Sequence, residues 1–176
     1  SCWFLLGCVV LSFVFLFFPF AEVSNQYSPK AIGTVHLFTL GILSMIIFGA
    51  MQQMMPVLAS AIIKKPKLFA NIVHPSLVLG TLFMSFSFIL ELRFFLHIGV
   101  LFLSIAFLTF FAVSIRLLFK VEFLTSTVKA MRLFSVAGLI TLILGLIIAI
   151  SHITLNFSTH YYSFVNMHML FGLFGF

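Results

Sequence analysis

Charged residues are scarce in this chain of 176 amino acids. Only 7% of its residues are Asp, Glu, Lys or Arg, whereas 63% are hydrophobic and 17% are aromatic. A soluble domain usually carries about a quarter charged residues. The few charges of this chain therefore cannot solvate a globular surface of this size. The composition excludes a soluble enzyme and a disordered chain. It predicts an all-α fold, a polytopic transmembrane helical bundle.

Acidic residues are almost absent. The chain has no Asp, and its three acidic residues, Glu22, Glu91 and Glu122, lie between the apolar segments. Catalysis by paired carboxylates, a Ser-His-Asp triad and a carboxylate-rich metal site are therefore excluded. Because no acid lies inside an apolar segment, proton-coupled transport through buried carboxylates is disfavoured as well.

Cysteine is also rare. Cys2 and Cys8 are six residues apart on one expected helix and do not face each other, which argues against a disulfide between them. The chain has neither a CxxCH haem attachment motif nor a glycine-rich phosphate-binding loop. The six histidines are the remaining residues that could carry chemistry.

Charges and turn-forming residues divide the chain into six apolar segments. Crossing the hydrocarbon core takes about 20 helical residues, so five segments can cross it, whereas the sixth would cover only ~21 Å as a helix. We therefore expect one transmembrane domain that forms the N-terminal half of a longer protein. The expected spans are 2–20, 33–56, 68–90, 94–119, 133–157 and an incomplete 163–176.

Basic residues are distributed unevenly between the loops. Lys30 and Arg93 lie on one side, and the other seven flank the loops between the second and third and between the fourth and fifth spans. The positive-inside rule places those two loops and the N-terminus in the cytoplasm, in an inner or plasma membrane. These few loop residues do not predict nucleic-acid binding. The seven are Lys64, Lys65, Lys67, Arg116, Lys120, Lys129 and Arg132.

Five of the six histidines fall at the outer face in this topology. Imidazole tolerates the membrane interface, so a single interfacial histidine is weak evidence of function. Several imidazoles from different helices at one depth are what a haem or metal site in a helical bundle requires. His74 alone lies on the cytoplasmic half, near the Lys-rich loop, and we expect it to be structural. The five outer histidines are His36, His97, His152, His160 and His168.

Small residues line one face of each of the last two expected helices. Such a face leaves room for a flat macrocycle, and it equally permits close approach of another helix. His152 lies at the outer end of the first face, which makes it a weaker candidate for cofactor binding. The two faces consist of Gly138, Thr141, Gly145, Ala149 and His152, and of His168, Gly172 and Gly175.

The second apolar segment carries a recognisable pattern. It opens Val35-His36-Leu37-Phe38-Thr39-Leu40-Gly41, has a second glycine near its inner end, and closes Met54-Met55-Pro56-Val57. This pattern resembles the haem-copper oxidase subunit I superfamily, and the related NnrS-type haem and copper membrane proteins have a comparable His-to-Gly opening. The segment Val165-Asn166-Met167-His168-Met169-Leu170-Phe171-Gly172 resembles a second such opening.

The resemblance implies a role in respiratory electron transfer, as an oxidoreductase that binds haem. In that family the second helix supplies an axial ligand to a low-spin haem, which here would be His36. The sixth helix supplies a ligand to a copper or non-haem iron centre, which here would be His168. The implied partners are the lipid bilayer and other membrane or cytochrome subunits.

The sequence departs from the haem-copper oxidase pattern after His168. Oxygen-reducing members continue after this histidine with a Pro-Glu-Val-Tyr-like stretch, whereas here Met169-Leu170-Phe171 follows and no tyrosine lies within 163–176. Oxygen reduction is therefore not expected.

One alternative function is a cofactor-free transporter or permease in which the small-residue faces line a substrate route. The other is a structural subunit of a membrane complex.

Overall fold

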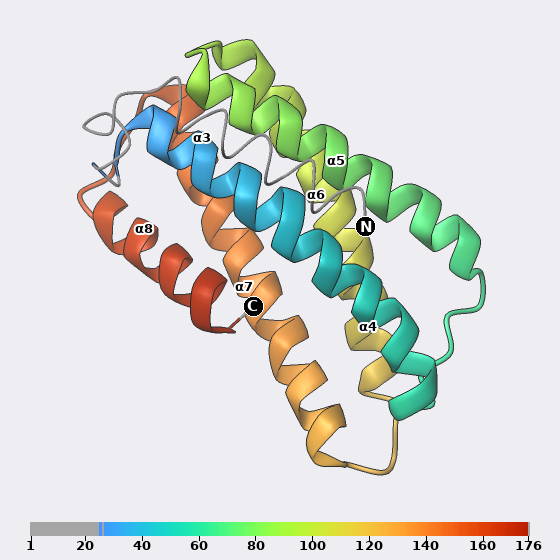
Figure 1. The fold of residues 1–176 in the computed structure, drawn as a ribbon. Coiled ribbons are helices and arrows are strands. Elements are labelled where there is room, and N and C mark those ends of the chain that lie inside the picture. The colour runs from blue at the N-terminus through green and yellow to red at the C-terminus, as the bar shows by residue number, and fades with distance from the viewer. Residues whose placement is uncertain (1–24, 26, 176) are drawn as a thin grey trace. The chain divides into compact units, whose positions relative to one another are not determined.

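Every described element of regular structure is helical (Figure 1). The structure is a computed structural model in which residues 25 and 27–175 are described, so the expected span 2–20 lies outside the described residues. The all-α prediction is confirmed. The elements are α3 (Pro29–Phe38), the π-helix η1 (Thr39–Ser44), α4 (Met45–Leu58), α5 (Pro66–Ile89), α6 (Arg93–Leu118), α7 (Ser126–Thr154), α8 (Tyr161–Leu170) and the π-helix η2 (Phe171–Gly175).

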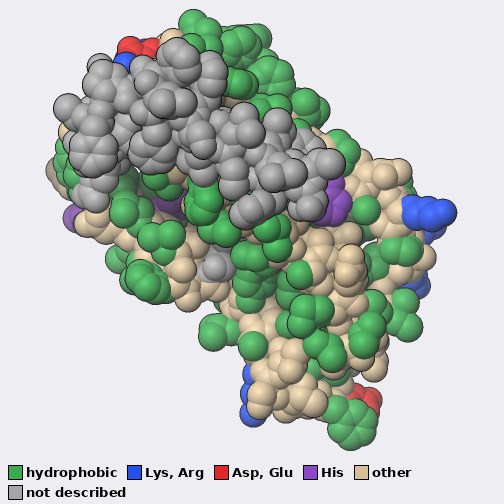
Figure 2. All heavy atoms as spheres, in the orientation of Figure 1, with side chains coloured by type: hydrophobic (Ala, Val, Ile, Leu, Met, Phe, Trp, Pro, Cys, Tyr) green, Lys and Arg blue, Asp and Glu red, His purple; other side chains and the backbone are tan. Residues whose placement is uncertain are grey.

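Within the described residues, four helices are long and apolar enough to cross a membrane. They are the continuous run Pro29–Leu58, which includes α3, η1 and α4, and the helices α5, α6 and α7. Large hydrophobic side chains are exposed along all of them, and Figure 2 shows such side chains over much of the described surface. The protein is therefore a multi-pass membrane protein whose apolar surface faces the lipid bilayer.

Two helices begin earlier than the hydrophobicity pattern predicts, because each has a polar cap. Ser28 Oγ accepts a hydrogen bond from the Ala31 N–H at 3.2 Å, so α3 begins at Pro29 rather than at residue 33. Thr125 Oγ1 accepts from the Val128 N–H at 3.3 Å, so α7 begins at Ser126 rather than at residue 133. The first turns of α7 are therefore polar and precede its apolar part.

Left-handed residues follow three of the membrane helices. Ser60, Glu91 and Leu155 have φ values of 50°, 57° and 56° and lie just beyond α4, α5 and α7. A left-handed residue directs the chain out of the helical path, so it ends the helix. The expected stop at Pro56 does not occur, since α4 continues to Leu58.

The chain divides into two compact units. The first contains Ser1–Phe48 and His74–Leu103, and the second contains Gly49–Val73 and Ser104–Phe176. In the first unit α5 and α6 approach closely at two glycines: a Cβ added at Gly80 or Gly99 would lie 2.7 Å or 2.6 Å from the other helix. Only glycine permits such a separation of two membrane helices.

Aromatic packing forms the core of the second unit. The Phe110 ring lies 5.5 Å from Phe111, edge to face, and 6.0 Å from Phe69. Phe111 in turn lies 6.2 Å from Phe134 of α7. These separations are in the favourable range for aromatic pairs, so the cluster joins α5, α6 and α7 within this unit.

Candidate functional site

Both histidines of the resemblance stand directly before a π-helical segment. His36 lies three residues before η1, which begins at Thr39, and His168 lies three residues before η2, which begins at Phe171. All six histidines are described, and the other four have no π-helical segment next to them. Short π-helical segments in α-helices are frequent at functional sites because they redirect side chains and disturb the backbone ladder.

His36 is oriented by its own helix. Its Nδ1 lies 2.8 Å from the carbonyl oxygen of Ile32, one turn earlier in α3. A carbonyl oxygen can only accept, so Nδ1 carries the hydrogen and Nε2 carries the lone pair. The ring is half-buried and lies beside Phe88 of α5, with centroids 6.5 Å apart and planes inclined by 22°. This is the tautomer that a histidine needs in order to bind a metal through Nε2.

His168 is oriented by a neighbouring helix. Its Nδ1 lies 2.9 Å from the carbonyl oxygen of Thr141 in α7, so Nδ1 again carries the hydrogen. The ring also lies over Gly145, where an added Cβ would be 2.9 Å from Cε1. The imidazole is therefore held by a hydrogen bond and by close packing against α7, again with the lone pair on Nε2.

The predicted small-residue faces of α7 and α8 lie against each other. Figure 1 shows the two helices side by side, and the added Cβ atoms of Gly172 and Gly175 would lie 3.4 Å and 2.9 Å from Thr141 and Ala137. The sequence left open whether these faces make room for a macrocycle or for a helix. Here each face is covered by the other helix, which is the more common use of such glycines.

His152 is paired with a tyrosine. Its Nε2 lies 2.7 Å from the Tyr161 hydroxyl, and the rings of Tyr161 and Phe157 pack against it edge to face. Burial, with a smaller contribution from the charge of Tyr162, raises the pKa of Tyr161 above its ordinary value, so the hydroxyl stays protonated. Nε2 of His152 is thus already engaged in a hydrogen bond. Sequence reasoning missed this pair, because α8 begins at Tyr161 rather than at residue 163.

His97 and His160 have few protein contacts. His97 is exposed and its Nδ1 lies 3.1 Å from the carbonyl oxygen of Arg93 in its own helix. His160 is exposed at the residue before α8 and makes no side-chain capping hydrogen bond. His97 repeats the local hydrogen bond of His36 without the adjoining π-helical segment, which makes it a matched control.

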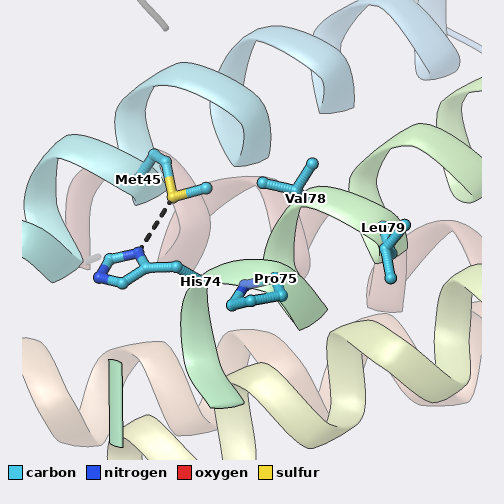
Figure 3. Close-up of a pocket in the computed structure, with 5 residues that line it drawn as sticks. All are labelled: Met45, His74, Pro75, Val78 and Leu79. Atoms are coloured by element: carbon cyan, nitrogen blue, oxygen red, sulfur yellow. Dashed lines mark hydrogen bonds between the residues drawn. The ribbon is translucent and has the colours of Figure 1, made fainter. Parts of the chain in front are cut away.

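His74 lines a cavity with a methionine (Figure 3). Its Nδ1 lies 3.2 Å from Sδ of Met45, and the described lining residues border an open hollow of about 600 Å³. The expectation that His74 is structural did not include this partner, which is 29 positions away in sequence. Met45, His74, Pro75, Val78 and Leu79 line the cavity, all within the first unit.

Two further findings concern metal ligands and similarity to known proteins. Within the described part of the chain, no group of three or more His, Cys, Asp or Glu side chains is arranged to hold a metal ion. No protein-family model, curated protein or solved structure matches the chain. The features that distinguish the candidate ligands therefore lie in the local geometry of each histidine.

Proposed function

We propose that the protein is a haem-binding membrane redox protein similar to haem-copper oxidase subunit I. In this proposal His36 is an axial haem ligand and His168 is a ligand of a second metal, copper or non-haem iron. The observation that carries the proposal is shared by these two histidines and by none of the other four. Each stands three residues before a π-helical segment with its Nδ1 bonded to a backbone carbonyl oxygen.

The surroundings of His36 fit a haem ligand. An axial imidazole must be neutral and must present Nε2 at a constant angle, and donation from Nδ1 to a backbone carbonyl provides both. The bond to Ile32 provides that donation, and Phe88 adds an aromatic surface beside the ring. When bound, haem would supply one-electron redox chemistry. The chain's own contribution is to orient the imidazole through the bond to Ile32.

The surroundings of His168 fit a metal ligand better than a haem ligand. Its ring is held between α8 and α7, and the glycines that could have admitted a macrocycle pack α8 against α7. An ion needs only the Nε2 lone pair and further ligands from elsewhere. His152 stays the weaker cofactor candidate, because a ligand role would require its Nε2 to leave the Tyr161 hydroxyl.

The alternative functions have less support. The transporter hypothesis relied on small-residue faces that would line a substrate route. Those faces instead approach each other closely, because a Cβ added at Gly145 would lie 2.9 Å from His168 and one added at Gly172 would lie 3.4 Å from Thr141. A structural subunit would need no histidine with a defined tautomer, and no observation favours it specifically.

The proposed orientation has the N-terminus in the cytoplasm of a cell with an inner or plasma membrane. The basic residues before α5, at the end of α6 and in the first turns of α7 support it. A reporter inserted between Lys64 and Lys67 should behave as cytoplasmic, and one inserted at Asn25 as external. The reverse pattern would contradict the orientation.

The test of the function is an optical spectrum. Protein purified in detergent after haem addition should show a Soret band, and His36→Ala should lose or shift it while the protein is still inserted in the membrane. His97→Ala is the matched control and should leave the spectrum unchanged, because it removes the same local hydrogen bond from a histidine outside the proposed site. The proposal fails if wild type shows no Soret band or if His36→Ala retains it.

A further inference from the structure

Met45 and His74 bring two soft or borderline metal ligands together inside the membrane. Met45 lies at the start of α4 and His74 lies eight residues into α5, which is ~12 Å along the helix axis. Figure 3 shows the thioether sulfur directed at the imidazole, at 3.2 Å from Nδ1. A histidine at such a depth in a membrane helix is rare and marks a functional site more often than not.

We propose that these two residues bind a copper(I) ion. Typical lengths of ~2.3 Å for a metal–sulfur bond and ~2.0 Å for a metal–nitrogen bond can be combined with the observed 3.2 Å separation. They give an angle of about 96° at a metal that contacts both donors. Because the sulfur now lies in the direction of the Nδ1 hydrogen, the thioether or the ring must shift to admit the ion. The cavity of about 600 Å³ beside them leaves room for a further ligand.

The chemistry of the lining selects the metal. Thioether sulfur is a soft ligand that favours copper(I), and imidazole binds copper as well. The other described lining residues are Pro75, Val78 and Leu79, which offer no side-chain donor and no negative charge. Burying a divalent ion such as zinc without a compensating anion costs far more than burying a monovalent one. A low-coordinate, singly charged, soft ion fits these surroundings.

Binding requires a change of tautomer and no change of charge on the protein. In the structure Nδ1 donates its hydrogen to the sulfur, since a thioether can only accept. To bind copper(I), the imidazole must carry its hydrogen on Nε2 and present the Nδ1 lone pair. The proton moves from one ring nitrogen to the other, and the metal keeps its oxidation state.

The experiment is a copper(I) titration of the full chain in detergent, without oxygen, against a chromophoric copper(I) chelator. The background carries Cys2→Ser and Cys8→Ser, because thiolates bind copper(I) and these are the two cysteines of the sequence. Met45→Leu preserves side-chain volume, and His74→Gln preserves polarity. We expect each to weaken copper(I) binding by at least about tenfold.

Matched controls separate this site from others. Met54→Leu changes an exposed methionine of the same helix, and His97→Gln changes an exposed histidine, so both should bind copper(I) like the background. The background also carries His168→Ala, so that the other proposed metal ligand does not contribute to the titration. X-ray absorption of the copper(I) complex should show a sulfur ligand that Met45→Leu removes.

The outcomes are decisive in either direction. Unchanged copper(I) affinity in Met45→Leu and His74→Gln would overturn the proposal. The result is independent of haem binding, because the titration uses copper(I) alone.

Discussion

The histidines before η1 and η2 look alike in sequence but are held differently. His36 donates to a carbonyl oxygen of its own helix, one turn away, whereas His168 donates to a carbonyl oxygen of α7 and packs over Gly145. The first arrangement is complete within α3. The second exists only while α7 and α8 are packed together. A local hydrogen bond and a tertiary one thus produce the same tautomer, and they respond differently to changes in packing.

Gly33→Ala should give the largest loss of stability while sparing the orientation of His36. An added Cβ would lie 2.8 Å from the backbone carbonyl oxygen of Ser85, which cannot yield, and 2.8 Å from Ile89. Overpacking of this kind costs about 3 kcal/mol, so thermal unfolding in detergent should occur at a lower temperature. Because the bond to Ile32 is internal to α3, the folded fraction should still bind haem through His36.

The control for this change is Gly49→Ala. No atom lies within 4 Å of a Cβ added at Gly49, so its effect should be below about 1 kcal/mol. Equal destabilisation by the two substitutions would show that Gly33 does not act through close packing against α5.

Gly145→Ala should have an intermediate effect on stability and a specific effect on His168. The added Cβ would lie 2.9 Å from Cε1 of the imidazole, so the ring must move away from α7 and lose its bond to Thr141. We expect a loss of about 2 kcal/mol in unfolding free energy. The binding of a second metal should weaken, whereas the haem spectrum should not change. If metal binding survives, His168 is not held in place by α7.

Tyr161→Phe should have the smallest effect. It removes the 2.7 Å hydrogen bond to His152 while the ring stays, which costs about 1 kcal/mol. Tyr162→Phe, at a side chain that is 64% exposed, is the control and should change little. Thermal unfolding of the three proteins measures the difference, and equal midpoints for Tyr161→Phe and wild type would contradict the assignment.

The same tyrosine predicts a dependence on alkaline pH. Burial raises the pKa of Tyr161 above the ordinary value of 10.0, so above that value the folded state holds a proton that the unfolded state has lost. Its contribution to stability is complete below pH 10.0 and disappears as the pH rises through the higher folded value. Tyr161→Phe should lose less stability than wild type between pH 9 and pH 11, a range set at about one unit on either side of the ordinary tyrosine pKa.

The composition of the sequence was sufficient to predict the fold class, and its helical periodicity was sufficient to locate two small-residue faces. Thr141 and Gly145 of the α7 face lie against Gly172 of η2 and His168 of α8, because glycine and threonine at intervals of three and four residues leave a shallow surface. Periodicity could not say what covers such a surface. A helix and a macrocycle both need a strip without side chains.

The first residues of the helices were predicted less well, because the prediction placed each helix start at the first residue of an apolar segment. The first turns of α7 contain Lys129 and Arg132, which hydropathy treats as loop residues. Arg132 in fact donates to the carbonyl oxygens of Leu118 and Val121. The signal that could have located the true start is Thr125 followed by Ser126, a common N-terminal capping pattern.

The contacts between distant residues were not predictable from the sequence. The pairing of His74 with Met45 depends on the register between two antiparallel helices, which hydrophobicity does not determine. The π-helical segments are also invisible to periodicity over so few residues, because they shift the phase of a helix by a single residue. The two histidines were selected through the resemblance, and their shared backbone context emerged only in three dimensions.

Imidazole rescue of His36→Gly tests the central claim most directly. Removing the side chain leaves a space that free imidazole can enter, and a ligand role can be restored in this way whereas a purely structural role cannot. The low-spin haem spectrum should disappear in His36→Gly and return on addition of imidazole, with no return in buffer alone. A spectrum that persists in His36→Gly, or one that imidazole does not restore in folded protein, would contradict the role of His36 as an axial ligand.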